Sequence, residues 1–149
     1  MTVVRPGRIA DADTIVDFQI RMAAETEQLV LDRDRVGKGV KAVFEDPAKG
    51  AYWVAEQAGR VVGGLLTVPE WSDWRNGTVL WIHSLYVIPE ARGQGVFRAL
   101  YATLREQVEA SGDLCGLRLY VDRGNDRAQS VYEALGMDGE HYRVYEWMK

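Results

Sequence analysis

The stretch WIHSLYVIPEARGQGVFRALYATL at residues 81–104 decides the fold of this 149-residue chain. Its first part reads as a strand that ends at Pro89, because proline cannot donate to a ladder of backbone hydrogen bonds. After the turn at residues 92–95, apolar residues recur at four-residue spacing, which predicts an amphipathic helix. The segment is therefore a strand, a glycine-containing turn and a helix.

This turn has the features of a phosphate-binding site. The first backbone N–H groups of a helix have no intrahelical acceptor, and the helix dipole adds positive potential at the same end. Gly93 and Gly95 lack the Cβ atoms that would keep an anion at a distance, and Arg92 adds a permanent positive charge. We therefore expect this turn to bind phosphate.

Two common nucleotide-binding loops do not fit the turn. A Gly-x-Gly-x-x-Gly pattern that begins at Gly93 would need glycine at position 98, where the chain has Arg98. The loop of nucleoside-triphosphate enzymes needs Gly-Lys-Ser or Gly-Lys-Thr, which the sequence lacks. What remains is an Arg-x-x-Gly turn between a strand and a helix.

Two further segments complete a recognisable pattern. Residues 116–122 read GLRLYVD, and residues 125–137 read NDRAQSVYEALGM. Together with VIPEARGQG at residues 87–95, they form an order of motifs that resembles the GNAT superfamily of N-acetyltransferases. The likeness covers most of the chain, and it implies that acetyl-coenzyme A is the cosubstrate and that no metal takes part.

The resemblance also implies roles for individual residues. The backbone groups of Leu85, Tyr86 and Val87 would contact the pantetheine arm, and Asn125 would contact the coenzyme. The coenzyme's pyrophosphate would bind to the turn formed by Arg92, Gly93, Gln94, Gly95, Val96 and Phe97. Family members usually have glycine or alanine in place of Phe97, so either the turn is slightly shifted or this ring points away from the coenzyme.

Length and composition set further limits. A chain of this length suits one domain over residues 1–149, with a core that needs no disulfide or metal. The single Cys115 and the absence of a targeting segment favour a cytoplasmic protein. The formal charge of -4 argues against a nucleic-acid partner, and no apolar run approaches the roughly 20 residues of a membrane span.

Local patterns predict the element order β-α-α-β-β-β-α-β-α-β. The predicted strands are Val3–Ile9, Ala51–Glu56, Arg60–Val68, Gly77–Ile88, Leu117–Val121 and His141–Met148. Helices are predicted over residues 12–27, after Asp32, after Gly95 and after Asn125. We expect an α/β fold with a mixed, mostly antiparallel sheet of about six to seven strands, flanked by about four helices.

Acetyl transfer from a thioester to an amine needs a base for the amine and a proton for the departing thiolate. The resemblance implies that Tyr132 is the general acid, whereas its spacing with apolar neighbours is equally typical of a core aromatic residue. His83 is the candidate base because its ordinary pKa lies near ~6.5, and a structural histidine is the alternative. Glu70 or Glu25 could replace it as the base.

The segment EWSDWR at residues 70–75 is predicted to be the loop that chooses the acceptor. Trp71 and Trp74 could hold a cationic or aromatic amine by cation–π contact, with Glu70, Asp73 and Glu25 supplying negative charge. A packed turn or a homodimer contact through this loop is the alternative.

The sequence thus predicts acetyl transfer from acetyl-coenzyme A to a primary amine, with a small molecule as the acceptor. Acetylation of a protein lysine or N-terminus is a second hypothesis, which would need an open groove in place of a pocket closed by Trp71 and Trp74. A module that senses acyl-coenzyme A without turnover is the third.

Overall fold

The structure is a computed structural model that describes all of residues 1–149. Contacts divide it into two compact units, Met1–Leu119 and Tyr120–Lys149, and each is described by itself. The first unit contains β1 (Thr2–Pro6), a short 3-10 helix (Ile9–Asp11), α1 (Ala12–Glu27), α2 (Arg33–Glu45), β2 (Ala51–Gln57), β3 (Arg60–Ser72), β4 (Gly77–Val87), a second 3-10 helix (Pro89–Ala91), α3 (Val96–Ala110) and β5 (Leu114–Leu119). The second unit contains α4 (Asp126–Ala134). A single domain over the whole chain stays a prediction.

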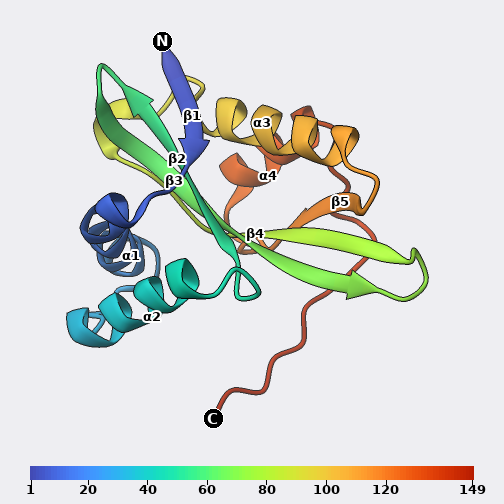
Figure 1. Ribbon diagram of the computed structural model, residues 1–149, viewed down its shortest axis with the longest axis horizontal. Coiled ribbons are helices and arrows are strands. Elements are labelled where there is room, and N and C mark those ends of the chain that lie inside the picture. Colours follow the sequence, from blue (N-terminus) through green and yellow to red (C-terminus); the bar gives the residue numbers. More distant parts are fainter. The chain divides into compact units, whose positions relative to one another are not determined.

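One sheet organises the first unit, with the strand order β1-β2-β3-β4-β5 (Figure 1). The first four strands pair antiparallel, whereas β5 pairs parallel to β4. This confirms the predicted α/β fold with a mixed, mostly antiparallel sheet. The β3–β4 hairpin extends past the end of β2 (Figure 1).

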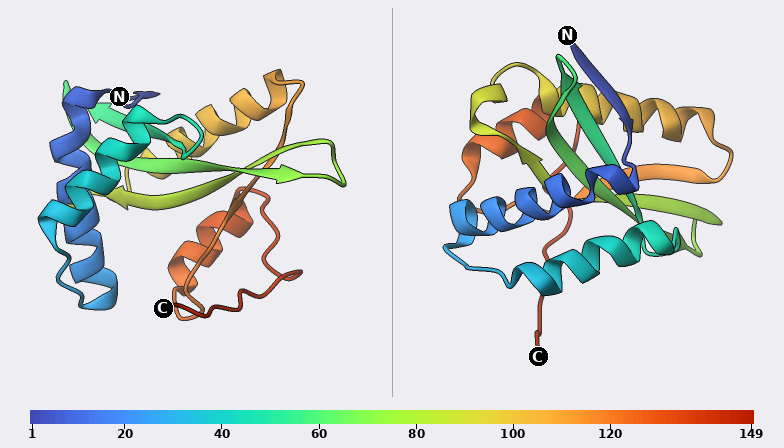
Figure 2. Two further views of the ribbon diagram at one scale, coloured as in Figure 1. Left: turned by 60° about the horizontal axis from the view of Figure 1, so that its bottom comes forward. Right: turned by 60° about the vertical axis from the view of Figure 1, so that its left-hand side comes forward.

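Helices cover the two faces of this sheet (Figure 2). On one face, α1 and α2 lie side by side and enclose a core cluster of Ile15, Val16, Val40, Tyr52 and Val54. On the other face, α3 buries an apolar stripe of Val96, Leu100, Tyr101 and Leu104. The α3 helix approaches the sheet so closely that a Cβ added to Gly63 would lie 3.1 Å from the side chain of Val96.

Several local predictions are confirmed. The β2–β3 hairpin turns through Ala58 and Gly59, which both have positive φ as a two-residue hairpin turn requires. The predicted helix after Asp32 begins at Arg33, and Asp32 caps it by accepting a 3.1 Å hydrogen bond from the backbone N–H of Arg35. Asn125 caps α4 in the same way, with Ala128 as the donor. The cap predicted at Asp11 is wrong, because the carboxylate of Asp11 binds Arg5 and the backbone N–H of Arg8 in place of the start of α1.

A β-bulge in β4 changes which side chains share a face. Gly64 of β3 pairs with Tyr86, and Leu66 pairs with His83, so two residues of β4 lie opposite one residue of β3. Ser84, inside the bulge, has a positive φ of 53°. Residues paired directly across a ladder lie on one face, so the bulge brings His83 and Tyr86 to the same face although they are three residues apart.

The predicted last strand, His141–Met148, is wrong. Residues 141–149 form no strand, and Tyr145 and Trp147 are largely exposed. Their alternating pattern is typical of a strand, but a strand exists only when its backbone pairs with a neighbour, and local sequence does not supply one. The sheet accordingly has five strands instead of the predicted six to seven.

Three strand boundaries also differ from the prediction. The strand expected at Val3–Ile9 ends at Pro6, where its pairing with β2 stops, and Ile9 begins a 3-10 helix. The strand expected at Leu117–Val121 runs over Leu114–Leu119, because it pairs with β4 from Thr78 onward. The loop expected at residues 70–75 is shorter, because β3 continues to Ser72 and leaves only a tight turn before Gly77. These last two differences arise from pairing with β4, which starts β5 at Leu114 and continues β3 to Ser72.

Candidate active site

The end of β4 has an unpaired edge. The ladder between β4 and β5 runs from Thr78 and Leu114 to Ile82 and Leu119, so residues 83–87 have no partner on β5. These residues still pair with β3 on their other side, up to Gly63 opposite Val87. Unpaired backbone groups of Leu85, Tyr86 and Val87 on the β5 side are therefore available to an extended ligand, except the carbonyl of Val87, which accepts a hydrogen bond from Arg92.

The glycine turn follows this edge directly. Gly93 and Gly95 have φ values of 76° and 77°, and Gly95 is the N-cap residue of α3. No atom lies within 4 Å of a Cβ built on either glycine, so backbone conformation and not crowding requires them. The first backbone N–H groups of α3 lack intrahelical acceptors here, as expected of an anion-binding turn.

Gln94 and Phe97 make contacts close to the turn itself. The side chain of Gln94 donates a 2.9 Å hydrogen bond to the carbonyl of Glu90, which braces the turn. The ring of Phe97 lies 6.0 Å from that of Tyr101, one helical turn further along α3. Phe97 thus packs against a residue of its own helix.

Arg92 is held by two partners. Its Nε donates a 2.9 Å hydrogen bond to the carbonyl of Val87, and its Nη2 lies 2.7 Å from a carboxylate oxygen of Glu25 in the last turn of α1. The other oxygen of Glu25 accepts a 2.7 Å hydrogen bond from the hydroxyl of Tyr86. Arg92 and Tyr86 together lower the pKa of Glu25, so Glu25 is poorly suited to act as a base.

Tyr86 anchors the bulged strand to α1. Its ring lies 5.3 Å from that of Phe18, and the guanidinium carbons of Arg21 and Arg92 each lie 5.5 Å from its centre. Burial, together with the hydrogen bond to Glu25, raises the pKa of its hydroxyl. Sequence reasoning did not find Arg21, because its role depends on the packing of α1 against the sheet.

His83 is half-buried on the sheet face that carries α1 and α2. Its imidazole stacks beside the indole of Trp81, with 6.2 Å between ring centres and 16° between ring planes. Burial lowers its pKa below the ordinary value, because it disfavours the charged imidazolium. Burial therefore favours the neutral imidazole, the form that can accept a proton.

A row of polar and aromatic side chains continues from His83 across three strands. Glu70 of β3 accepts a 3.1 Å hydrogen bond from the indole N–H of Trp81 and a 2.8 Å bond from Nη1 of Arg118 on β5. The guanidinium carbon of Arg118 lies 6.0 Å from the centre of the Trp81 ring. Trp81 and Arg118 are ladder partners, and Glu70 pairs with Val79, two residues before Trp81, so their contacts could not be seen without strand register.

The tip of the β3–β4 hairpin carries the remaining predicted acceptor residues. Trp71 and Trp74 are 64% and 90% exposed, so they close no pocket within the first unit. A side-chain oxygen of Asp73 accepts a 3.0 Å hydrogen bond from the backbone N–H of Trp74. The tip is thus a tight turn that displays two indoles.

The second unit contains the two remaining predicted residues. Asn125 caps α4 through its side-chain oxygen. Tyr132 is half-buried on α4, and burial raises the pKa of its hydroxyl above the ordinary value. The hydroxyl is therefore protonated at neutral pH, as a proton donor must be.

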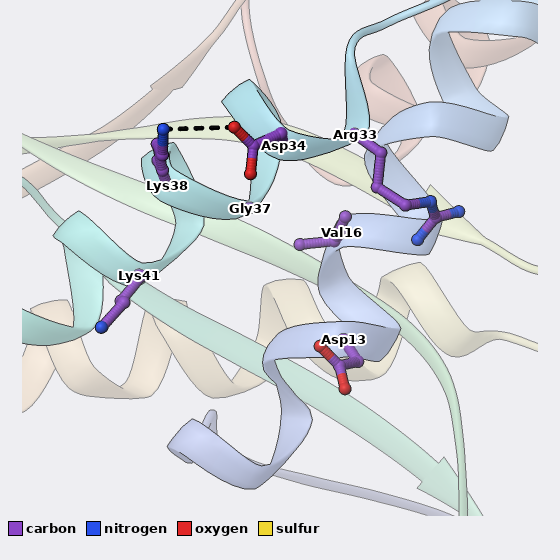
Figure 3. A pocket seen from close by; sticks show the side chains of 7 residues that line it. All are labelled: Asp13, Val16, Arg33, Asp34, Gly37, Lys38 and Lys41. Atoms are coloured by element: carbon purple, nitrogen blue, oxygen red, sulfur yellow. Dashed lines mark ion pairs between the residues drawn. The ribbon is translucent and has the colours of Figure 1, made fainter.

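A groove of about 540 Å³ between α1 and α2 contains none of the predicted residues (Figure 3). Its lining is charged, with Asp13, Arg33 and Lys41 among its side chains. Lys38 and Asp34 form a 3.1 Å ion pair within it, and both are about 80% exposed. An open groove of solvated charges offers no enclosed binding site.

Neither a metal-binding cluster nor a membrane-spanning helix is found. No cluster of three or more His, Cys, Asp and Glu side chains could hold a metal ion. None of the helices combines the length and apolar character needed to cross a membrane.

The fold and the turn define a class of protein. Residues 15–137 match the Acetyltransferase (GNAT) family, so the chain belongs to this family of acyltransferases. The crystal structure of a possible acetyltransferase from Clostridium difficile 630 has a TM-score of 0.92 and 40% sequence identity, and the match covers 100% of this chain and 98% of that one.

Two curated relatives are mycothiol acetyltransferases. That of Thermobispora bispora is 36% identical over 61% of this chain and 30% of its own length. That of Kocuria rhizophila is 38% identical over 42% of this chain and 20% of its own length. The matched region thus spans less than a third of these relatives.

Proposed function

We propose that the chain is an acetyl-coenzyme A dependent N-acetyltransferase that acts on a small primary amine. The observation that supports this best is the unpaired edge of β4 at residues 83–87, followed directly by the glycine turn at the start of α3. An extended amide-containing arm fits a free strand edge, and a pyrophosphate fits a helix N-terminus. Family membership supports acetyl-coenzyme A as the donor.

In this proposal, different residues bind different parts of the coenzyme. Leu85, Tyr86 and Val87 bind the pantetheine arm through their backbone groups. The turn from Arg92 to Phe97 binds the pyrophosphate, and Asn125 adds a contact to the coenzyme besides its capping role. Arg92 lies beside the turn in an ion pair with Glu25, and both side chains are partly exposed, so the guanidinium is accessible to an anion.

The proposed reaction is direct attack. The neutral amine nitrogen of the acceptor attacks the thioester carbonyl carbon, and His83 takes the amine proton through a water molecule. The carbon–sulfur bond breaks, and Tyr132 gives its hydroxyl proton to the departing thiolate. The pKa shifts of both residues support these roles, since burial keeps His83 neutral and Tyr132 protonated.

The acceptor is proposed to meet the hairpin tip. Trp71 and Trp74 offer exposed indole faces to a cationic or aromatic amine, and Asp73 adds negative charge. The carboxylate of Glu70 accepts hydrogen bonds from Trp81 and Arg118. The carboxylate of Glu25 accepts hydrogen bonds from Tyr86 and Arg92. Each carboxylate would therefore divide its negative charge between these partners and the acceptor.

A peptide amine is the second candidate acceptor. The two tryptophans of the hairpin tip are exposed and leave the first unit open, which suits a longer acceptor better than a closed pocket does. Mycothiol acetyltransferase relatives support a small-molecule acceptor instead.

Release of free thiol from acetyl-coenzyme A tests the proposed function. The purified chain is mixed with panels of small amines, aminoglycosides and lysine-containing peptides, with Arg105→Gln as a control on the exposed side of α3. We expect turnover with at least one small amine. Turnover with peptides alone would replace the small-molecule acceptor, and coenzyme binding without any turnover would indicate a sensor.

A further inference from the structure

The row from Glu70 to His83 has a feature that the proposed reaction does not use. Four side chains from three neighbouring strands lie on one sheet face, and each contacts the next: Arg118, Glu70, Trp81 and His83. Adjacent strands fix the spacing of such a row, because their Cβ atoms lie about 5 Å apart across each ladder.

Glu70 is a fixed acceptor within this row. Its two carboxylate oxygens accept from different donors, one from the indole of Trp81 and one from the guanidinium of Arg118. The side chains of Arg118 and Glu70 are 29% and 43% exposed, so their ion pair is only partly screened by solvent. A carboxylate bound on both oxygens is poorly placed to take a proton from an acceptor amine.

Trp81 connects Glu70 and Arg118 to His83. Its N–H is directed to Glu70, and Arg118 lies over its ring, so the hydrogen bond and the cation together define the indole plane. The imidazole of His83 lies nearly parallel to that plane, with a 16° angle between the rings. A rotated indole could not keep this arrangement.

We propose that Trp81, Glu70 and Arg118 are positioning residues that hold the imidazole of His83 in place for proton transfer. The proposal rests on the proposed function, in which His83 is the base. Glu70 orients the indole, Arg118 holds Glu70, and the indole face limits rotation of the imidazole. None of the three contacts the reacting atoms.

NMR of the histidine side chains tests the contact without any substrate. The chain has two histidines, so the His83 signal is assigned by its loss in His83→Gln. Trp81→Leu removes the aromatic ring and should shift the His83 Cε1–H signal, because the ring current of the indole disappears. Trp53→Leu, which alters a tryptophan of β2, is the matched control and should leave this signal unchanged.

Glu70 and Arg118 should act through Trp81. Glu70→Leu should move the His83 signal in the same direction as Trp81→Leu but by less. Glu70→Gln keeps an oxygen for the indole N–H and should shift the His83 signal least. Arg118→Gln should shift this signal by an amount between those of Glu70→Gln and Glu70→Leu.

Kinetics separates positioning from general stability. With an amine found by the thiol-release panel, Trp81→Leu and Glu70→Leu should lower kcat roughly ten- to a hundredfold, as expected when a reacting group is misplaced. The KM for acetyl-coenzyme A should stay within about twofold, because the β4 edge and the glycine turn are intact.

The outcomes of the two assays are distinct. An unchanged His83 signal in Trp81→Leu overturns the proposal, and so does an unchanged kcat when His83→Gln has lost turnover. If His83→Gln keeps full turnover, the base assignment in the proposed function fails, and the positioning proposal is overturned with it.

Discussion

At the scale of single residues, Tyr132 and His83 carry the proposed proton transfers. Burial shifts the two pKa values in opposite directions, upward for the phenol and downward for the imidazole. Both shifts have one cause, because an apolar environment disfavours whichever form is charged. The donor therefore keeps its proton at neutral pH, and the neutral form of the acceptor is favoured.

Tyr132→Phe should lower turnover while coenzyme binding is unchanged. The substitution keeps the ring on α4 but removes the hydroxyl, so the loss should fall in the range of roughly 10²–10⁴-fold that general acids contribute. Steady-state kinetics gives the turnover, and calorimetry gives the affinity for coenzyme A. Wild-type turnover in the variant would leave Tyr132 as a core aromatic residue of α4.

The acidic limb of the kcat/KM profile should depend on His83. Its folded pKa lies below the ordinary ~6.5, so activity should hold at pH 7 and fall only as the pH drops below that value. His83→Ala should remove or shift this limb, and the defect should shrink at high pH, where bulk water can accept the proton. If Glu25→Gln removes the limb instead, the base is a carboxylate.

At the scale of elements, the turn before α3 connects to α1 through one ion pair. The pair between Arg92 and Glu25 lies beside the expected pyrophosphate, so Glu25 competes with the ligand for the same guanidinium. The two side chains are 43% and 38% exposed, and such pairs contribute only about 0–1 kcal/mol. The competition should therefore be measurable but small.

Arg92→Glu should weaken coenzyme A binding strongly, because it places a negative charge at the pyrophosphate. Glu25→Gln should tighten binding by up to about fivefold, because Arg92 is released from its partner. Calorimetry with coenzyme A measures both, and pantetheine, which lacks the pyrophosphate, should bind Glu25→Gln and wild type equally. Weaker coenzyme A binding by Glu25→Gln would show that Glu25 orients Arg92 instead.

The β3–β4 hairpin should determine acceptor affinity. Trp74 is 90% exposed, so its replacement by alanine removes a contact surface without opening the core. Trp74→Ala should raise the KM for the amine and leave the KM for acetyl-coenzyme A nearly unchanged. The reason is that the substitution removes a contact made to the amine alone. Equal effects on both KM values, or a change in oligomeric state, would favour a structural role for the hairpin.

At the scale of the whole molecule, a partly buried ion-pair cluster joins the first strand to the rest of the sheet. Arg5 of β1 donates to both carboxylate oxygens of Asp11 and, through Nε, to Glu56 of β2. Asp11 is only 8% exposed and also accepts from the backbone N–H of Arg8. The position of Asp11 before α1 predicts an N-cap, but its side chain does not cap that helix because these two partners occupy the carboxylate.

Asp11→Asn should destabilise the fold by about 2 kcal/mol at pH 7, because charge-assisted hydrogen bonds are weakened in a buried place. Arg5 lowers the folded pKa of Asp11 below the unfolded value near ~3.9. The stabilisation is therefore present above that unfolded value and is lost as the pH falls through the folded pKa. Urea unfolding at pH 7 and at pH 3 measures the difference, which should be smaller at the lower pH.

Much of the fold could be predicted because its signals are local. The strand, glycine turn and helix around Arg92 are visible in adjacent residues, as are the hairpin turn at Ala58 and the cap Asn125. The predicted strand at residues 141–148 fails for the opposite reason. Its alternating pattern is local, but the backbone partner that would make it a strand is not.

The sequence by itself determined the class of this protein, because motif order and glycine positions require only neighbouring residues. Only the tertiary structure decided which charged groups meet. Glu25 lies 67 residues before Arg92 and 61 before Tyr86, and Glu70 lies 48 before Arg118. Such pairs depend on strand register, on the bulge in β4 and on helix packing, which place distant side chains within hydrogen-bonding distance without leaving a periodic signal in the chain.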